Sequence, residues 1–243
     1  MRQTRRSFLG TGAGLDGWIM ALDGMPLAEP QQIGGDIVLG PGQRADLFVD
    51  VVADDGATAD LARRDRDDSY SQVAFRVAGS AAPAPRPAPP PLPPNPNMDL
   101  PDLAGARRIT PNMAGGAMGR MSSAMLHGQQ MTMQQLVQAG QFWALNGVAG
   151  MTDTPLAVLH RNEAVRLTMV NDTAWPHAMH LHATHLHELG PDGTPGPLRD
   201  TVLMASGETR EVALVADNPG KWLFHCHMLS HAASGMMTWI EVA

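Results

Sequence analysis

The stretch that decides the fold lies near the C-terminus and reads Phe224-His225-Cys226-His227-Met228-Leu229-Ser230-His231-Ala232-Ala233-Ser234-Gly235-Met236. It holds the only cysteine of the chain and three of the ten histidines, and a methionine follows five residues after the last of these. Imidazole, thiolate and thioether groups together suit copper, and two histidines, one cysteine and a weak axial methionine are typical of a blue-copper site. The alternative is a buried structural cysteine beside unrelated histidines.

A second histidine cluster, His177-Ala178-Met179-His180-Leu181-His182, lies upstream. Successive side chains of an extended strand point to opposite faces, so His180 and His182 share one face and His177 points to the other. The same alternation separates Cys226 from its two histidine neighbours. The pattern therefore predicts two groups of side chains, one with His180, His182, His225 and His227, and the other with His177, Cys226, His231 and Met236.

The order His-x-x-His-x-His followed by His-Cys-His-x-x-x-His-x-x-x-x-Met resembles the last domain of the multicopper oxidases, the family of the laccases and the copper-efflux oxidases. Ala178 stands where this family usually has proline, and Met237 is a less favoured axial candidate on spacing. The resemblance implies a type 1 copper held by His177, Cys226, His231 and axial Met236. It also implies a type 2 ligand, His180, and the type 3 ligands His182, His225 and His227.

The resemblance implies a copper-dependent oxidoreductase that takes single electrons from a reductant and reduces dioxygen to water. Electrons would pass from the type 1 copper through Cys226 to His225 and His227, which are therefore the predicted catalytic residues. Cu(I) and phenol-like compounds are the candidate reductants. This activity needs both a type 1 site and an oxygen-reducing site built from the type 2 and type 3 ligands.

The type 1 site of the resemblance is complete, but the type 2 and type 3 sites are partial. The family draws further ligands from His-x-His motifs in its first domain, whereas the only histidines before His177 are His127 and His160. We expect the sequence to cover the second and third cupredoxin domains, with the first domain missing, and a partner chain to be one source of the missing histidines. The alternative is a blue-copper electron-transfer protein, or a copper-binding and copper-tolerance protein, without oxidase activity of its own.

The composition of the chain bears on its binding partners, and its N-terminus bears on the cell compartment to which it is sent. The chain has 243 residues and a formal net charge of −7, which gives no indication of a nucleic-acid partner, and no apolar run reaches the length of a membrane span. The stretch Thr4-Arg5-Arg6-Ser7-Phe8-Leu9-Gly10 matches a twin-arginine export signal, so residues 1–15 are expected to direct a folded protein to the periplasm. A plain basic N-terminal tail is the alternative.

Two segments follow in which no copper ligand is predicted. Residues 16–79 resemble part of the middle cupredoxin domain of the family, and Trp18–Leu27 reads as a strand, a tight Asp-Gly turn and a second strand. Residues 80–101 are dense in proline and are typical of a stiff, extended linker.

Residues 102–140 form a methionine-rich segment that also holds His127. Thioethers select Cu(I), and copper-efflux oxidases carry comparable insertions. Alternatively, these methionines pack a helix from about Ser122 to Ala139; the two interpretations are compatible. The methionines are Met113, Met118, Met121, Met125, Met131 and Met133.

Residues 141–243 are predicted to form the C-terminal cupredoxin domain, an all-β Greek-key sandwich with the type 1 copper at one end. Short strands separated by turn residues support this fold class. His160 is expected at the surface, and a metal-binding role for His185 and His187 stays open, because their offset from His182 places them off the cluster face in a regular strand. The expected strands are Phe142–Gly147, Leu156–His160, Ala164–Val170, Thr201–Ala205, Arg210–Val215, Trp222–His225 and Met236–Val242.

Overall fold

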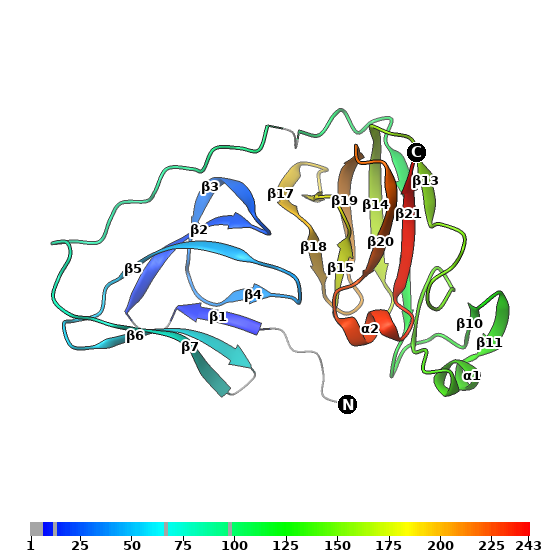
Figure 1. Ribbon diagram of the computed structural model, residues 1–243, viewed down its shortest axis with the longest axis horizontal. Coiled ribbons are helices and arrows are strands. Elements are labelled where there is room, and N and C mark those ends of the chain that lie inside the picture. The colour runs from blue at the N-terminus through cyan, green and yellow to red at the C-terminus, as the bar shows by residue number, and fades with distance from the viewer. Residues whose placement is uncertain (1–6, 12–13, 66–67, 97–98) are drawn as a thin grey trace. The chain divides into compact units, whose positions relative to one another are not determined.

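The computed structural model describes residues 7–11, 14–65, 68–96 and 99–243. The described residues are mostly β-strand, which confirms the predicted all-β fold, and the chain divides into two compact units, Met1–Pro96 and Asn97–Ala243 (Figure 1). Arg5 and Arg6 of the export motif lie outside the described residues. Part of the same segment, Ser7–Thr11, forms strand β1.

Unit 1 contains two antiparallel sheets. One has the order β4-β1-β6-β7 and the other the order β3-β2-β5. The predicted hairpin after Trp18 is present, and its turn residues Asp23 and Gly24 both have positive φ, as a two-residue hairpin turn requires. The strand bounds are β1 (Ser7–Thr11), β2 (Leu15–Leu22), β3 (Met25–Gln32), β4 (Ile37–Leu39), β5 (Ala45–Val51), β6 (Thr58–Asp65) and β7 (Asp68–Arg76).

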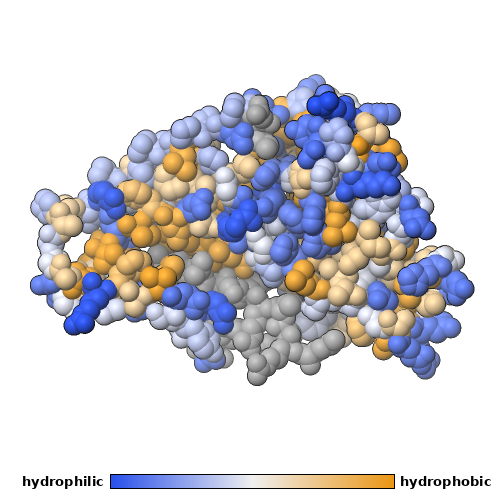
Figure 2. Space-filling model, in the orientation of Figure 1, coloured by the Kyte–Doolittle hydropathy of each residue, from blue (hydrophilic) through white to orange (hydrophobic). Residues whose placement is uncertain are grey.

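The two units differ in how much apolar surface they bury. Several large apolar side chains of unit 1 are exposed, and Figure 2 shows apolar residues gathered on its visible face. Both clusters of buried apolar side chains among the described residues lie in unit 2. Unit 2 therefore holds the larger buried apolar core of the described chain. The exposed large apolar residues of unit 1 are Val38, Val51, Val52, Tyr70, Val73 and Leu92.

The proline-rich segment that ends unit 1 has no regular secondary structure over residues 80–96. Arg86 holds it against β5, because the Arg86 Nε donates to Asp50 Oδ1 at 2.7 Å and the guanidinium lies 4.1 Å from the centroid of the Phe48 ring. The segment thus contains no helix or strand, and the charged contact of Arg86 and a hydrogen bond from Asn95 to the Met25 sulfur tie it to unit 1.

Unit 2 is a sandwich of two main sheets. One has the order β12-β9-β14-β19-β16-β17, with β8 also paired to β14, and the other has the order β13-β21-β20-β15-β18. A small hairpin, β10-β11, stands beside them. The strands are β8 (Arg107–Ile109), β9 (Asn112–Gly115), β10 (Ser123–Leu126), β11 (Gln129–Thr132), β12 (Trp143–Leu145), β13 (Ala157–Leu159), β14 (Glu163–Asn171), β15 (His177–Leu181), β16 (Leu186–Leu189), β17 (Pro195–Arg199), β18 (Thr201–Met204), β19 (Thr209–Ala216), β20 (Gly220–Cys226) and β21 (Met237–Val242); the helices are α1 (Met133–Gln138) and α2 (Leu229–Ala233).

The core of unit 2 lies between these sheets and follows from strand alternation. On β14, Val165, Leu167 and Met169 are fully buried while the residues between them are partly exposed. Phe224 on β20 meets them from the facing sheet and is also fully buried. Each such side chain contributes about 1.5–3 kcal/mol by leaving water, so the strands that carry the candidate ligands are firmly held.

The expected helix over Ser122–Ala139 is wrong. Ser123–Leu126 and Gln129–Thr132 form the β10-β11 hairpin, and only Met133–Gln138 is helical. The turn residues His127 and Gly128 both have positive φ, which starts a hairpin instead of a helix. The helix begins later, where Thr132 and Gln135 form a capping box.

Candidate metal centre

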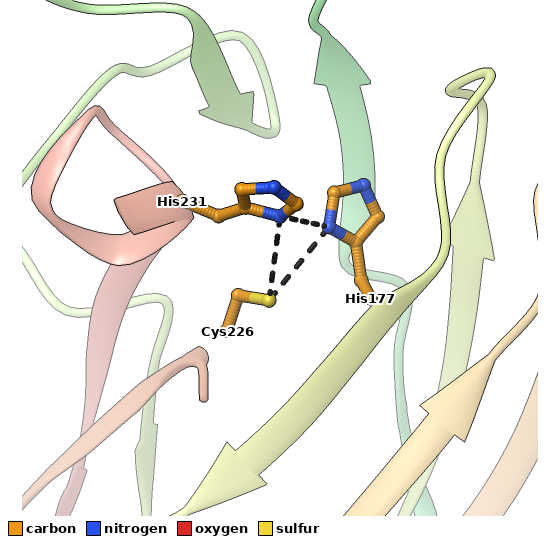
Figure 3. A group of neighbouring side chains, drawn as sticks. All are labelled: His177, Cys226 and His231. Carbon is orange, nitrogen blue, oxygen red and sulfur yellow. Dashed lines mark hydrogen bonds between the residues drawn. The ribbon is translucent and has the colours of Figure 1, made fainter. Parts of the chain in front are cut away.

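One group of ligand-type side chains gathers at the end of the unit 2 sandwich. His177 is the first residue of β15, Cys226 is the last residue of β20, and His231 lies in α2. The Cys226 Sγ lies 3.7 Å from His177 Nδ1 and 3.8 Å from His231 Nδ1, and the two Nδ1 atoms are 3.0 Å apart. Figure 3 shows the three side chains pointing toward one another from these three elements.

Met236 belongs to the loop that closes this group. It is fully buried in the same core cluster as Cys226. Its backbone amide donates to the His231 carbonyl at 3.0 Å, and its carbonyl accepts from the Cys226 amide at 3.1 Å. The loop therefore ties Met236 to both residues through the backbone and places a thioether in the same buried region.

Trp143 packs against both imidazoles of the group. Its ring centroid lies 4.9 Å from that of His177 and 4.5 Å from that of His231. No sequence pattern predicts this contact, because Trp143 is distant in the chain from both histidines. The indole leaves the two rings little room to turn and covers them on one side.

Burial decides the charge of this group. Loss of solvent lowers the pKa of His177 to about 3 and the pKa of His231 to about 4, and it raises the pKa of the Cys226 thiol to about 11. The two imidazoles are therefore neutral near pH 7, with lone pairs available. A metal ion that binds here must displace the thiol proton, as thiolate coordination always requires.

A second group consists of His180, His182 and His225. The β15-β20 register sets His180 directly opposite His225, and the His182 and His225 Nε2 atoms are 3.1 Å apart. His227 lies beside them, with its ring centroid 5.4 Å from His180 and 5.7 Å from His225. Four imidazoles therefore gather on one face of this sheet.

Backbone carbonyls fix which nitrogen of two of these histidines is free. The His180 Nδ1–H donates to the Asp200 carbonyl at 2.7 Å, and the His225 Nδ1–H donates to the Cys226 carbonyl at 2.9 Å. Because a carbonyl only accepts, Nε2 of each ring is left with its lone pair. Burial lowers the pKa of both imidazoles, which favours the neutral form that binds metal.

The two groups are connected by three consecutive residues at the end of β20 and just beyond it. Cys226 belongs to the first group, and His225 and His227 on either side of it belong to the second. Strand alternation sends neighbouring side chains to opposite faces. The two groups therefore lie on opposite faces of the sheet, and only a few covalent bonds of the backbone separate Cys226 from the histidines of the second group. The arrangement suits chemistry in which one centre communicates with another.

The remaining histidines lie away from both groups. His127 and His160 are exposed. His185 and His187 follow the end of β15 and line a separate cavity of about 380 Å³, where the His187 Nδ1–H donates to the Gly196 carbonyl at 3.2 Å. The regular strand assumed for this stretch ends at Leu181, and the chain then crosses to β16 in the other sheet.

The methionine-rich segment divides between packing and exposure. Met121, Met131 and Met133 pack against the buried cluster around Leu136, whereas Met118 is exposed. Met125 and His127 instead line a cavity of about 700 Å³ together with Met151 and Met237. Met151 lies outside the segment and Met237 lies far from it in sequence, so no sequence pattern associates them with it.

Comparisons with known proteins agree with the fold and the site. The family model for multicopper oxidases matches residues 125–243. Over 99 residues the chain is 36% identical to the multicopper oxidase MmcO of Mycobacterium tuberculosis, and over 100 residues it is 34% identical to copper resistance protein A of Pseudomonas syringae pv. tomato; each match covers 41% of this chain. The matches cover 19% and 16% of those relatives, so the chain aligns with less than a fifth of their length.

Solved structures extend the likeness to nearly the whole chain. Lac15 from a marine microbial metagenome has a TM-score of 0.70 at 36% identity, and a multi-copper oxidase from Pseudomonas thermotolerans has a TM-score of 0.74 at 28% identity. Each comparison covers 98% of this chain and 52% of the other. A β-sandwich with this cysteine–histidine group defines a cupredoxin-like domain. The chain belongs to the multicopper oxidase family, of which it spans the part that carries these cupredoxin domains.

Proposed function

We propose that this chain is part of a copper-dependent oxidase that oxidises a reductant in one-electron steps and reduces dioxygen to water. Copper bound to the chain would supply the one-electron chemistry. His177, Cys226, His231 and Met236 would hold a type 1 copper. His180 would serve a type 2 copper, and His182, His225 and His227 would serve type 3 coppers.

The donor set of the first group is the observation that carries the proposal. Cys226 Sγ and two imidazole nitrogens lie within 3.8 Å of one another, and a buried methionine closes the same loop. Soft sulfur and imidazole ligands together suit copper better than magnesium, calcium or manganese, which prefer oxygen. Neutral histidines and a protonated thiol also mean that only the thiol must lose a proton when the metal binds.

Cu(I) is the reductant class that the surroundings favour. The cavity lined by Met125, Met151, Met237 and His127 presents thioethers and one imidazole, which are soft ligands. Met237, which lines this cavity, directly follows Met236, the proposed axial ligand of the type 1 site. Phenol-like donors are the competing substrate class.

Copper content and colour test the proposal. The purified chain is loaded with copper, freed of excess metal and measured for copper per chain together with the visible thiolate-to-copper band. We expect a blue band that the Cys226→Ser variant lacks, and dioxygen uptake on addition of Cu(I) or a phenol once a partner chain supplies the missing histidine ligands. Copper binding without a blue band, unchanged in Cys226→Ser, would contradict the type 1 assignment.

An electron-transfer or copper-tolerance protein without its own oxidase activity is the second candidate. It is favoured by the difference between the groups: the first has a full blue-copper donor set, while the second has only four histidines within the described residues. About one copper per chain, a blue band and no dioxygen uptake would select this candidate. Export to the periplasm by the twin-arginine route is part of either proposal and is tested by locating the protein in cell fractions.

A further inference from the structure

His177 is the only ligand candidate of the first group whose outer nitrogen is held by a buried side chain. Its Nε2 lies 2.9 Å from the hydroxyl of Thr173, and both residues are buried. Its Nδ1 is the atom that faces Cys226. Which of the two nitrogens carries the proton in the neutral ring therefore decides whether a lone pair is aimed at the thiol.

The orientation of Asn171, the last residue of β14, is the first step in assigning that proton. One terminal atom of its amide lies 2.8 Å from the Trp175 carbonyl and 2.7 Å from the Ala205 carbonyl. Carbonyl oxygens only accept hydrogen bonds, so this atom must be the NH₂ nitrogen. The other atom, which accepts from the Thr173 amide at 3.2 Å, is the oxygen.

The proton of the Thr173 hydroxyl follows from that assignment. The hydroxyl lies 2.7 Å from the Asn171 Oδ1 and 3.0 Å from the Trp175 carbonyl, and neither oxygen can donate. The single hydroxyl proton is therefore used on this side. If it pointed to His177 instead, oxygen atoms 2.7 Å apart would face each other without a proton between them, which is costly in a buried site.

The lone pairs of the hydroxyl are left to accept. The Trp175 amide donates to one at 3.2 Å, and the remaining partner is His177 Nε2 at 2.9 Å. A neutral imidazole donates through only one nitrogen, so Nε2 carries the hydrogen and Nδ1 has its lone pair free toward Cys226. Every polar atom of Asn171 and of the Thr173 side chain is then satisfied.

We infer that Thr173, oriented by Asn171, is a positioning residue that holds His177 as the Nε2–H tautomer with Nδ1 directed at the cysteine. The inference deepens the proposed function, since it assigns His177 to the metal through Nδ1. It also adds a partner for the outer imidazole nitrogen, a contact that orients metal ligands and raises their basicity. Backbone carbonyls fix the ring protons of His180 and His225, whereas the ring proton of His177 is fixed by the side chain of Thr173, which can be changed by substitution.

The tautomer is read directly in the metal-free protein. Long-range ¹H–¹⁵N correlation spectra of ¹⁵N-histidine-labelled protein separate the protonated from the bare ring nitrogen, and the His177 signals are assigned by their loss in His177→Gln. We expect the Nε2–H form in the wild type and in Thr173→Ser, and a mixture of tautomers in the isosteric Thr173→Val. The exposed Thr209→Val is the matched control and leaves the spectrum unchanged.

An Nδ1–H tautomer in the wild type, or an unchanged tautomer in a folded Thr173→Val, would overturn the inference. The wild-type reading needs no substitution, so it decides the question even if Thr173→Val does not fold. In copper(II) titrations, Thr173→Val should lose about 10-fold to 100-fold in affinity and Thr173→Ser should recover it. Failure of the wild type to bind copper would sink the proposed function, while the tautomer reading would stand or fall by itself.

Discussion

At the scale of single residues, burial prepares the first group for a soft metal before any metal arrives. His177 and Cys226 are completely buried, and loss of solvent keeps the imidazole neutral and the thiol protonated. In the metal-free protein His177 and His231 therefore stay neutral at pH values at which a free imidazole accepts a proton. This has a consequence for stability that does not depend on copper.

The metal-free protein should lose stability as the pH falls below about 6.5. The pKa of His177 is lowered to about 3 and that of His231 to about 4 in the folded state, so between these values and 6.5 the unfolded chain binds protons that the folded chain does not. Stability is thus full above 6.5 and falls by up to about 1.4 kcal/mol per pH unit for each histidine. Urea unfolding followed by tryptophan fluorescence at several pH values measures this slope.

The His177→Gln variant is the control for this dependence. It should unfold with a pH slope smaller by up to one proton, because one of the histidines whose pKa burial lowers is gone. An identical slope in the variant and the wild type would show that the buried histidine does not cause the effect.

Met236 and Met237 are adjacent, and only one of them can be the axial ligand of the proposed site. Met236→Leu conserves volume and should cost less than about 1.5 kcal/mol in stability. We expect it to keep the blue band and to raise the reduction potential, because loss of a weak thioether donor destabilises Cu(II) more than Cu(I). Redox titration of the blue band measures the potential; a shift in Met237→Leu and none in Met236→Leu would reverse the assignment.

At the scale of elements, the turn between α2 and β21 determines where His231 and Met236 lie. Gly235 has a φ of 120°, and a Cβ atom there would lie 2.1 Å from the Trp143 carbonyl oxygen. The same turn joins the backbone of Trp143 to the Ser234 carbonyl, with the Trp143 amide donating at 3.1 Å. Glycine is therefore required for close approach of the two segments as well as for its φ.

Gly235→Ala should consequently disrupt this end of unit 2. Gly207 also has a positive φ but has open space around it, so Gly207→Ala tests the backbone strain alone, at about 1–2 kcal/mol. We expect Gly235→Ala to cost at least about 2 kcal/mol more, since a backbone carbonyl must move, and to weaken or abolish the blue band. Denaturant unfolding and the visible spectrum of the two variants decide; equal losses would contradict the proposed clash.

At the scale of the whole molecule, both histidine groups and both buried clusters belong to unit 2. The first group comes from β15, β20 and α2, and no residue of unit 1 takes part in either group within the described chain. Unit 2 also has its own two-sheet core, so its fold does not depend on the apolar residues that unit 1 leaves exposed.

Residues 97–243 expressed alone should therefore fold and form the same type 1 site as the full chain. The expected result is an equal blue band per chain and an equal reduction potential, because every proposed ligand and the packing around it are retained. Copper analysis and the visible spectrum of the two proteins make the comparison. Loss of the band in a folded unit 2 would show that unit 1 shapes the site.

The sequence by itself determined the fold class and the division of the histidines. The β-sandwich follows from short alternating strands, and the separation of His177 and Cys226 from His180 and His225 follows from the two-residue period of a strand, which is a local property. The helix expected over Ser122–Ala139 failed for a local reason as well, since His127 and Gly128 adopt positive φ and make a hairpin turn.

Only the tertiary structure decided which distant residues complete each site. Trp143 against the two imidazoles, the Ala205 carbonyl that orients Asn171, and the cavity that joins Met125 to Met237 all depend on contacts between segments that are far apart in the chain. Periodicity assigns a side chain to a face, but it does not say which other strand or loop meets that face. That choice is made by the packing of the two sheets, in which burial and hydrogen-bond satisfaction are settled together.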